Sequence, residues 1–288
     1  MRCVNGVCRC DMTCGERPQY AGVIGRGGMN KARRAGRRVA PGNAERPSPS
    51  PLPQQCAIMV ICMSGGRAAR CDDRGGQDGH FLNPGNVGFK QIIKPKTYVD
   101  KTGIIGYLNE WIDTDSRFVC VSRARRFGKT VAAQTIQAYY DNSCDSHDLF
   151  APYEIARDPS YEAHINKYDV IGLDVQSFFL LDDDPQAFIK RLETAVLEEV
   201  CAKWSDIDGL KGMGLVNALI KVHETTGAKF VFVIDEWDAV FRYYPEDDAL
   251  QKKWIHFLRD MFKQAAMNPC VALVYMTGIL PVKKYKTQ

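Results

Sequence analysis

From residue 81 onward, short apolar runs alternate with longer segments whose apolar residues recur at helical spacing. The apolar runs are rich in β-branched and aromatic side chains, as in strands that are buried on both faces. They predict strands at 117–121, 168–175, 229–234 and 271–276. The segments around them predict helices at about 104–112, 129–140, 184–200, 215–224 and 247–267. This alternation predicts an α/β fold of three layers, in which helices cover both faces of a parallel sheet.

Residues with capping chemistry stand near several of the predicted helix ends. Asp100 occupies the N-cap position of the first helix, where a side-chain oxygen can accept from the free backbone N–H groups. Asp184 and Pro185 begin the third helix, with proline at the first helical position. Gly227 ends the fourth helix.

The first predicted strand runs into a basic turn, residues 122–130, that ends in Gly128, Lys129 and Thr130. A strand followed by Gly-Lys-Thr and a helix is typical of a P-loop, which binds the phosphates of a nucleotide. Backbone N–H groups around Gly128 would face the phosphates, Lys129 would contact the β- and γ-oxygens, and the Thr130 hydroxyl would ligate Mg²⁺. The alternative is a basic loop ahead of an ordinary helix, because this tripeptide also occurs by chance.

The rest of the turn departs from the common pattern. Arg123 stands where most P-loops have their first glycine. Arg126 and Phe127 complete the predicted nucleotide-binding set. Arg125 and Arg126 either contact phosphates or are solvated loop charges.

The strand predicted at 229–234 ends in an acidic pair, Asp235 and Glu236. Ligands of open α/β sheets bind beyond the carboxyl ends of the strands, so this pair is expected beside the P-loop. Asp235 would position Mg²⁺, and Glu236 would accept a proton from an attacking water. An acidic pair that stood alone would more simply be a helix cap or a solvated turn, but a P-loop upstream favours a Walker B motif.

Two further polar residues close strands. Thr277 follows the strand at 271–276, either as a sensor of the γ-phosphate and the attacking water or as a turn former. Asp174 ends the strand at 168–175, and a structural role is expected for it.

Residues 1–80 have a different composition from residues 81–288, which form the predicted domain. The leader holds 13 Lys and Arg against 6 Asp and Glu, so it carries the basic excess of the chain. It also has 13 of the 24 glycines and a single aromatic residue, Tyr20, which together predict disorder. We interpret the leader as a solvated tail or an overextended reading frame.

The cysteines and the hydropathy pattern indicate the cellular compartment in which the protein is expected. Seven of the eleven cysteines lie in the leader, and the four nearest its start have no Cys-x₂-Cys spacing, which argues against a zinc site. The four beyond residue 80 are scattered, as in a reducing compartment, so a cytoplasmic protein is expected. No apolar run approaches the roughly 20 residues of a membrane span.

Several motifs, in order along the chain, resemble the predicted AAA-ATPase-like family, which is common in bacteria of anaerobic communities. The motifs are Asn83–Phe89, Tyr98–Gly103, Val121–Lys129, Tyr139–Asp141, Lys167–Val170, Val233–Asp238 and Met276–Pro281. Arg123 agrees with the family pattern, whereas Ala124 stands where the family usually has proline.

The resemblance implies an additional-strand ATPase with the sheet order 5-1-4-3-2, usually followed by a PD-(D/E)XK nuclease-like domain. Because the chain ends at Gln288, we expect a C-terminally truncated member whose fifth strand is missing. The P-loop strand would then be an unpaired edge. A link to DNA would exist only through the absent nuclease-like domain, and a homo-oligomer is compatible with the family.

The sequence therefore predicts ATP binding and Mg²⁺-dependent hydrolysis. Glu236 and Thr277 are the expected catalytic residues, and Thr130 and Asp235 the expected metal ligands. Two alternatives remain: a small-molecule kinase, which would need an acceptor pocket and a lid, and a nucleotide-gated interaction module that does not turn over.

Overall fold

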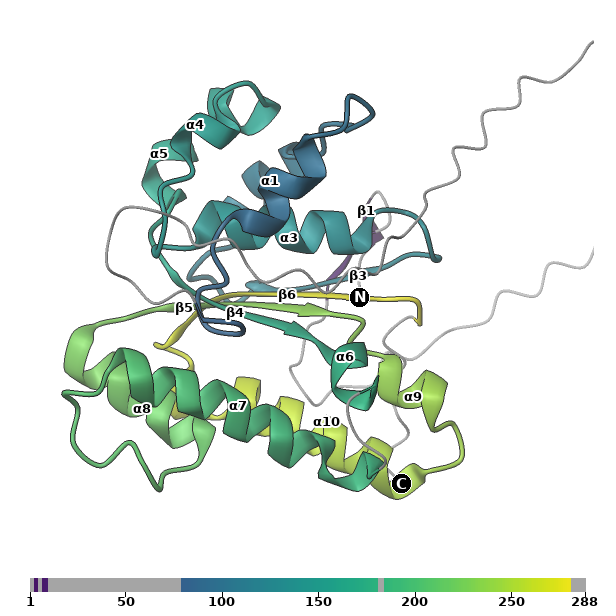
Figure 1. Ribbon diagram of the computed structural model, residues 1–288, viewed down its shortest axis with the longest axis vertical. Coiled ribbons are helices and arrows are strands. Elements are labelled where there is room, and N and C mark those ends of the chain that lie inside the picture. The colour runs from purple at the N-terminus through teal and green to yellow at the C-terminus, as the bar shows by residue number, and fades with distance from the viewer. Residues whose placement is uncertain (1–2, 5–6, 10–78, 181–183, 281–288) are drawn as a thin grey trace, which may run out of the picture. The chain divides into compact units, whose positions relative to one another are not determined.

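The computed structural model describes residues 3–4, 7–9, 79–180 and 184–280. Four parallel strands of the described chain lie side by side in the order β3, β6, β5, β4. Their bounds are β3 Phe118–Ser122, β4 Asp169–Asp174, β5 Phe230–Asp235 and β6 Val271–Gly278. Helices cover both faces of this sheet (Figure 1), so the predicted α/β class with a parallel sheet is confirmed.

The strands form because their side chains are apolar on both faces. In β5 every residue is buried, and successive side chains enter opposite cores. Phe230, Phe232 and Ile234 pack against one helical layer, while Val231 and Val233 pack against the other. This is the pattern expected of a central strand with helices above and below it.

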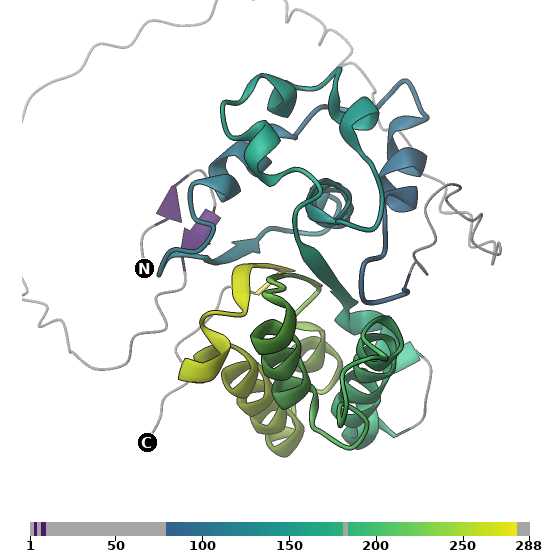
Figure 2. The ribbon, with the colours of Figure 1, turned by 90° about the vertical axis from the view of Figure 1, so that its left-hand side faces the viewer.

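One face carries the long amphipathic helices: α7 Phe188–Lys203, α8 Leu215–Thr226 and α10 Asp248–Lys263. Figure 2 shows these helices gathered below the sheet. The inward positions predicted for α10 are all buried: Leu250, Trp254, Phe257, Leu258 and Met261. Two short helices, α6 Val175–Leu180 and α9 Ala239–Tyr243, follow β4 and β5 at their carboxyl ends (Figure 1). Single 3₁₀ turns, Pro185–Ala187 and Ala265–Met267, flank α7 and α10.

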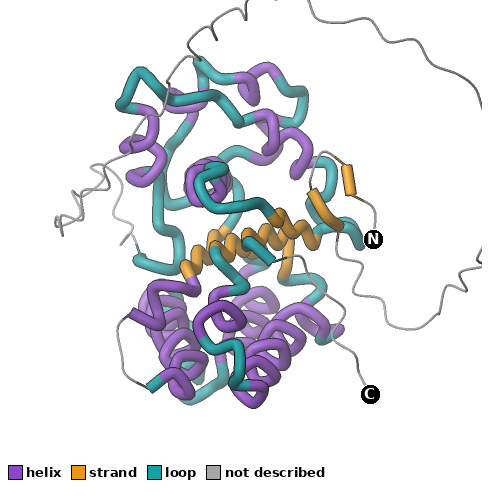
Figure 3. The backbone as a smooth tube through the Cα atoms, turned by 90° about the vertical axis from the view of Figure 1, so that its right-hand side faces the viewer, coloured by secondary structure: helices purple, strands orange, loops and turns teal. Residues whose placement is uncertain are grey.

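The other face is built around α3 Lys129–Tyr140, with shorter helices outside it (Figure 3). These are α1 Val87–Ile93, α2 Gly103–Asn109, α4 His147–Phe150, α5 Tyr161–His164 and the 3₁₀ turn η1 Glu154–Arg157. Buried polar side chains connect them. The Asp141 carboxylate accepts from Gly85 N at 2.7 Å, and the Asn166 amide donates to Asp141 O at 2.6 Å.

The helix ends follow the predictions in two places out of three. Asp184 accepts from Gln186 N at 2.9 Å, and Gly227 closes α8 in the left-handed conformation. The prediction for Asp100 was wrong, because Thr102 is the N-cap of α2. Asp100 instead accepts from the backbone N–H and hydroxyl of Thr102, two residues ahead, in a turn before the helix.

The expected free edge at β3 is also corrected. β2 Val7–Arg9 pairs with β3 in the antiparallel sense, with Cys8 opposite Cys120, and β1 Cys3–Val4 pairs with β2. Backbone groups of the leader therefore satisfy the edge that a fifth parallel strand was expected to cover. The rest of the leader lies outside the described residues, so its predicted disorder and the domain boundary at residue 80 stay predictions.

None of the helices in the described ranges is long and apolar enough to cross a membrane.

Candidate functional site

The turn after β3 has the backbone geometry of an anion cradle. Gly128 is the N-cap of α3 and adopts the left-handed conformation, with φ 77° and ψ 28°. Arg126 is also left-handed, with φ 68°, which costs a residue with a side chain about 1–2 kcal/mol. Left-handed residues in a turn direct successive N–H groups into one concavity, and the N-terminus of α3 adds its dipole there.

Lys129 lies inside this turn rather than in solvent. Its side chain is 5% exposed, and its ammonium donates to Ala124 O at 3.3 Å. The same ammonium lies 3.7 Å from Glu236 Oε1, so the turn and the acidic pair meet, as predicted. By contrast, Phe127 is 62% exposed, and Arg126 and Thr130 are exposed too.

The ends of β5 and β6 are joined around Asp235. Its Oδ1 accepts from the Thr277 hydroxyl and, at 3.1 Å, from Glu236 N. Thr277 is fully buried and lies inside β6, not after it. It therefore contacts the acid that was predicted to position Mg²⁺. Glu236 is left-handed, with φ 53°, so the chain turns sharply at the end of β5.

Arg242 on α9 closes the acidic side of the site. It donates from Nη2 to Glu236 Oε2 and from Nε to Asp238 Oδ1, the latter at 3.3 Å. Asp238 is fully buried, and its second oxygen accepts from Ile279 N at 2.8 Å and Leu280 N at 2.6 Å. The turn after β5 and the end of β6 are thus held together by one carboxylate, and Glu236 lies between two cations.

Asp174 adds a fourth carboxylate, beside Asp235, Glu236 and Asp238. It is the register partner of Asp235 on the neighbouring strand. Burial first, and then repulsion from Asp235 and Glu236, raise the pKa of Asp174 above its usual value. β4 pairs directly with β5 and is separated from β3 by β5 and β6, so Asp174 adjoins Asp235 but not the turn after β3, and the structural role expected for it stays a prediction.

Arg242 and Asp238 were not among the predicted site residues. A signal for them exists in the sequence, since Asp238 extends the acidic pair to Asp-Glu-Trp-Asp and Arg242 lies four residues further along. Residues four apart share one face of a helix, so an ion pair between them was predictable. Its contact with Glu236 was not, because it depends on the turn after β5.

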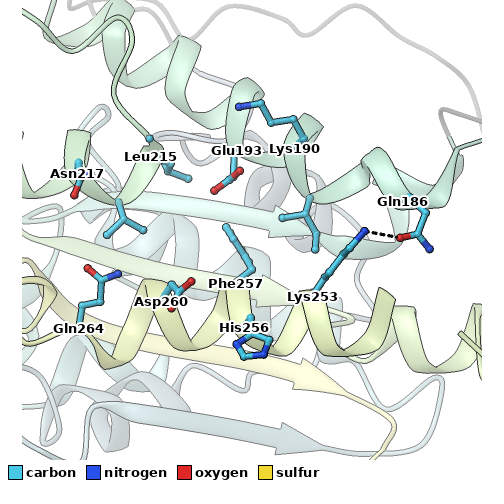
Figure 4. A pocket seen from close by; sticks show the side chains of 13 residues that line it. Gln186, Lys190, Glu193, Leu215, Asn217, Lys253, His256, Phe257, Asp260 and Gln264 are labelled. Carbon is cyan, nitrogen blue, oxygen red and sulfur yellow. Dashed lines mark hydrogen bonds between the residues drawn. The ribbon is translucent and has the colours of Figure 1, made fainter. Parts of the chain in front are cut away.

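A cavity of about 510 Å³ lies in the helical layer formed by α7, α8 and α10. Figure 4 shows its lining, including the hydrogen bond of 2.9 Å from Lys253 to Gln186. It contains none of the residues of the turn or the acidic pair. Among the described residues no group of three His, Cys, Asp or Glu side chains is arranged to hold a metal by itself. The features that identify the site are therefore the left-handed turn after β3 and the arrangement of the charged side chains around it.

The model of the AAA-ATPase-like family, described as predicted AAA-ATPase, matches residues 85–287. No curated protein and no solved structure matches the chain. The matched residues include the turn, the acidic pair and all four parallel strands. The chain therefore belongs to the AAA-ATPase-like family of predicted AAA-ATPases.

Proposed function

We propose that the domain binds ATP at the turn after β3 and hydrolyses it with Mg²⁺. The observation that carries this proposal is the approach of Lys129 to Glu236, 3.7 Å between Nζ and Oε1. Lys129 begins α3 directly after a left-handed glycine. The contact brings its side chain next to the acidic end of a buried parallel strand. Phosphate binding and water activation need these two groups within reach of each other.

The phosphate side of the site would use the backbone around Gly128 and the Lys129 ammonium. Phosphate oxygens would replace Ala124 O and Glu236 as partners of that ammonium, because charge-assisted bonds to phosphate are stronger than a bond to a carbonyl. Arg126 and Phe127 are exposed on the same turn and complete the proposed nucleotide contacts.

The residues at the site fit Mg²⁺, which prefers oxygen ligands and keeps several waters. The Thr130 hydroxyl and the Asp235 carboxylate would hold it, and it would neutralise charge on the phosphates. Glu236 would take the proton of the attacking water. Because Thr277 is buried and donates to Asp235, we assign it a positioning role and not direct contact with phosphate.

The strand order supports an additional-strand ATPase of the AAA-like kind. β6 lies between β3, which leads into the phosphate turn, and β5, which ends in the acidic pair. This is the order 1-4-3-2 when the P-loop strand is counted first. The homo-oligomer, the link to a nuclease-like domain and the cytoplasmic location stay predictions.

A second function, a nucleotide-gated module that does not hydrolyse, is favoured by one observation. The carboxylate of Glu236 is already engaged by Arg242, and a base held by an arginine is not free to approach water. No contact in the described residues favours the kinase alternative in the same way.

Titration with a fluorescent ATP analogue tests binding. The wild type should bind, and Lys129→Ala should weaken binding roughly a hundredfold or more, because it removes a charge-assisted contact to phosphate. Lys263→Ala, which changes an exposed lysine at the end of α10, is the matched control. Equal affinities of the wild type and Lys129→Ala would contradict the proposal. Release of phosphate from ATP without an added acceptor then separates hydrolysis from the module and the kinase.

A further inference from the structure

The segment Tyr98–Gly103 forms a fixed turn that the proposed function leaves unexplained. Asp100 Oδ1 accepts from Thr102 N at 2.8 Å and from the Thr102 hydroxyl at 2.7 Å, and Asp100 Oδ2 accepts from Glu154 N at 2.8 Å. Thr102 is fully buried, and its hydroxyl accepts from Ile155 N at 3.2 Å. The residues on both sides of Lys101 are therefore anchored to η1.

Lys101 projects from this anchored turn onto the phosphate turn. Its ammonium donates to Phe127 O at 3.3 Å. It also lies 3.0 Å from the point that a Cβ on Gly128 would occupy. The contact joins segments 26 residues apart, and it falls on the peptide that leads into the N-terminus of α3.

The charged groups around Lys101 leave its ammonium available to bind an anion. The Asp100 carboxylate next to it already accepts three hydrogen bonds. Partial burial would raise the pKa of Asp100, but the hydrogen bonds from Thr102 and Glu154 outweigh it and lower that pKa. An ammonium has three donors, of which Phe127 O takes one.

The two lysines hold opposite ends of the same turn. Lys129 contacts the carbonyl of Ala124 near its beginning, and Lys101 contacts the carbonyl of Phe127 near its end. Both lie where the backbone N–H groups of the turn and the dipole of α3 already favour negative charge. A chain of phosphates that entered the turn would thus meet a cation at each end.

We propose that Lys101 is a second phosphate-binding lysine of the nucleotide site, supplied by the turn before α2. This inference rests on the proposed function, since it names a further residue for the same ligand. The competing role is mechanical: Lys101 would brace the turn through Phe127 O alone and would not contact the nucleotide.

Three substitutions at Lys101 distinguish a role of its charge in binding phosphate from a mechanical role in supporting the turn. Lys101→Ala removes both the charge and the donor, Lys101→Arg keeps both, and Lys101→Gln keeps a donor without the charge. Lys96→Ala is the control, because Lys96 is exposed in the same segment. Each variant is titrated with fluorescent analogues of ATP and ADP at low and high salt, after circular dichroism has shown that it folds like the wild type.

We expect Lys101→Ala and Lys101→Gln to weaken binding about ten- to a hundredfold, more at low salt than at high salt. Lys101→Arg should recover most of the affinity, and Lys96→Ala should bind like the wild type. Wild-type affinity in Lys101→Ala, or recovery by Lys101→Gln as full as that by Lys101→Arg, would overturn the inference and leave the proposed function standing. A wild-type protein that binds neither analogue would overturn both.

Discussion

The two sides of the candidate site differ in how they are held together. On the acidic side, Asp235 and Asp238 are buried and each accepts several hydrogen bonds, from Thr277, Arg242 and neighbouring backbone groups. On the phosphate side, residues 123–127 are exposed, and two lysine side chains hold the turn through its own carbonyls. The acidic side is thus held together by hydrogen bonds between buried carboxylates and other protein groups. On the phosphate side, a bound anion would replace the lysine contacts.

The two sides should therefore respond differently to substitution. A change on the acidic side removes an acceptor from groups that are buried or partly buried, so it should cost stability as well as activity. A change on the phosphate side should act mainly on binding, because solvent reaches the turn.

Glu236→Gln tests whether the acidic side performs the chemistry. The substitution keeps size and hydrogen bonding but removes proton acceptance, so ATP should still bind while turnover falls by a factor on the order of 10² to 10⁴. Phosphate release and analogue titration measure the two quantities. Glu246→Gln, at an exposed position after α9, is the control. Turnover at the wild-type rate would place the base elsewhere.

Asp238→Ala tests whether the hydrogen bonds to the Asp238 carboxylate stabilise the acidic side. It leaves the Nε–H of Arg242 and two backbone N–H groups without their acceptor, so the free energy of unfolding should fall by about 3–5 kcal/mol, although Arg242 keeps its bond to Glu236. Urea denaturation measures this, with Asp206→Ala at an exposed position as control, which should change stability by less than about 0.5 kcal/mol. A loss for Asp238→Ala as small as the control's would remove the contrast between the two sides.

Gly128→Ala and Gly227→Ala compare a left-handed glycine on the phosphate side with a left-handed glycine at the end of α8. Both glycines are left-handed, with φ 77° and 74°, so each substitution should cost about 1–2 kcal/mol of stability. Gly227 has open space around it, whereas a Cβ at Gly128 would lie 3.0 Å from Lys101 Nζ. Affinity for the ATP analogue should therefore fall in Gly128→Ala and not in Gly227→Ala. An equal affinity in both variants would mean that the turn tolerates a side chain.

Asp174→Asn tests how the raised pKa of Asp174, caused first by burial and then by repulsion from Asp235 and Glu236, affects stability. The folded-state pKa of Asp174 is raised, so its protonated form is the one that folding favours, and this contribution is lost as the pH rises through that pKa. At pH 7 Asp174→Asn should therefore increase stability, by less than about 1 kcal/mol because the group is partly solvated. Below the usual pKa of 3.8 the increase should disappear. Urea denaturation at both pH values checks it, and an increase that persists in acid would show that charge is not its cause.

The sequence predicted the elements that depend on long patterns. Runs such as Phe230–Ile234 and the stripe from Leu250 to Met261 are specified locally, and both are found as predicted. The short helices α4, α5 and α9 were missed, because four or five residues are too few to show a period. They are held by distant partners instead, such as the bond of 3.0 Å from Asn86 to Ser146.

The residues of the candidate site also divide into those that a local pattern predicted and those that it missed. Gly128, Lys129, Asp235 and Glu236 were predicted because the motif and the strand end are contiguous in the sequence. Lys101 and Arg242 were not, because their contacts depend on where a turn and a short helix fall in space. The pairing of β2 with β3 was missed for a related reason: it joins residues far apart in the sequence, and the composition of the leader predicted disorder.

The tryptophan next to Glu236 gives the protein an optical reporter of this site. Trp237 is 5% exposed, its indole N–H is buried with no hydrogen-bond partner among the described residues, and its carbonyl accepts from Trp254 Nε1 at 2.9 Å. Indole emission depends on the polarity around the ring, and Gly278 Cα lies so close that a Cβ there would be 2.7 Å from Trp237 Nε1. A displacement of the turn after β5 would therefore alter the emission of two of the four tryptophans without any attached label.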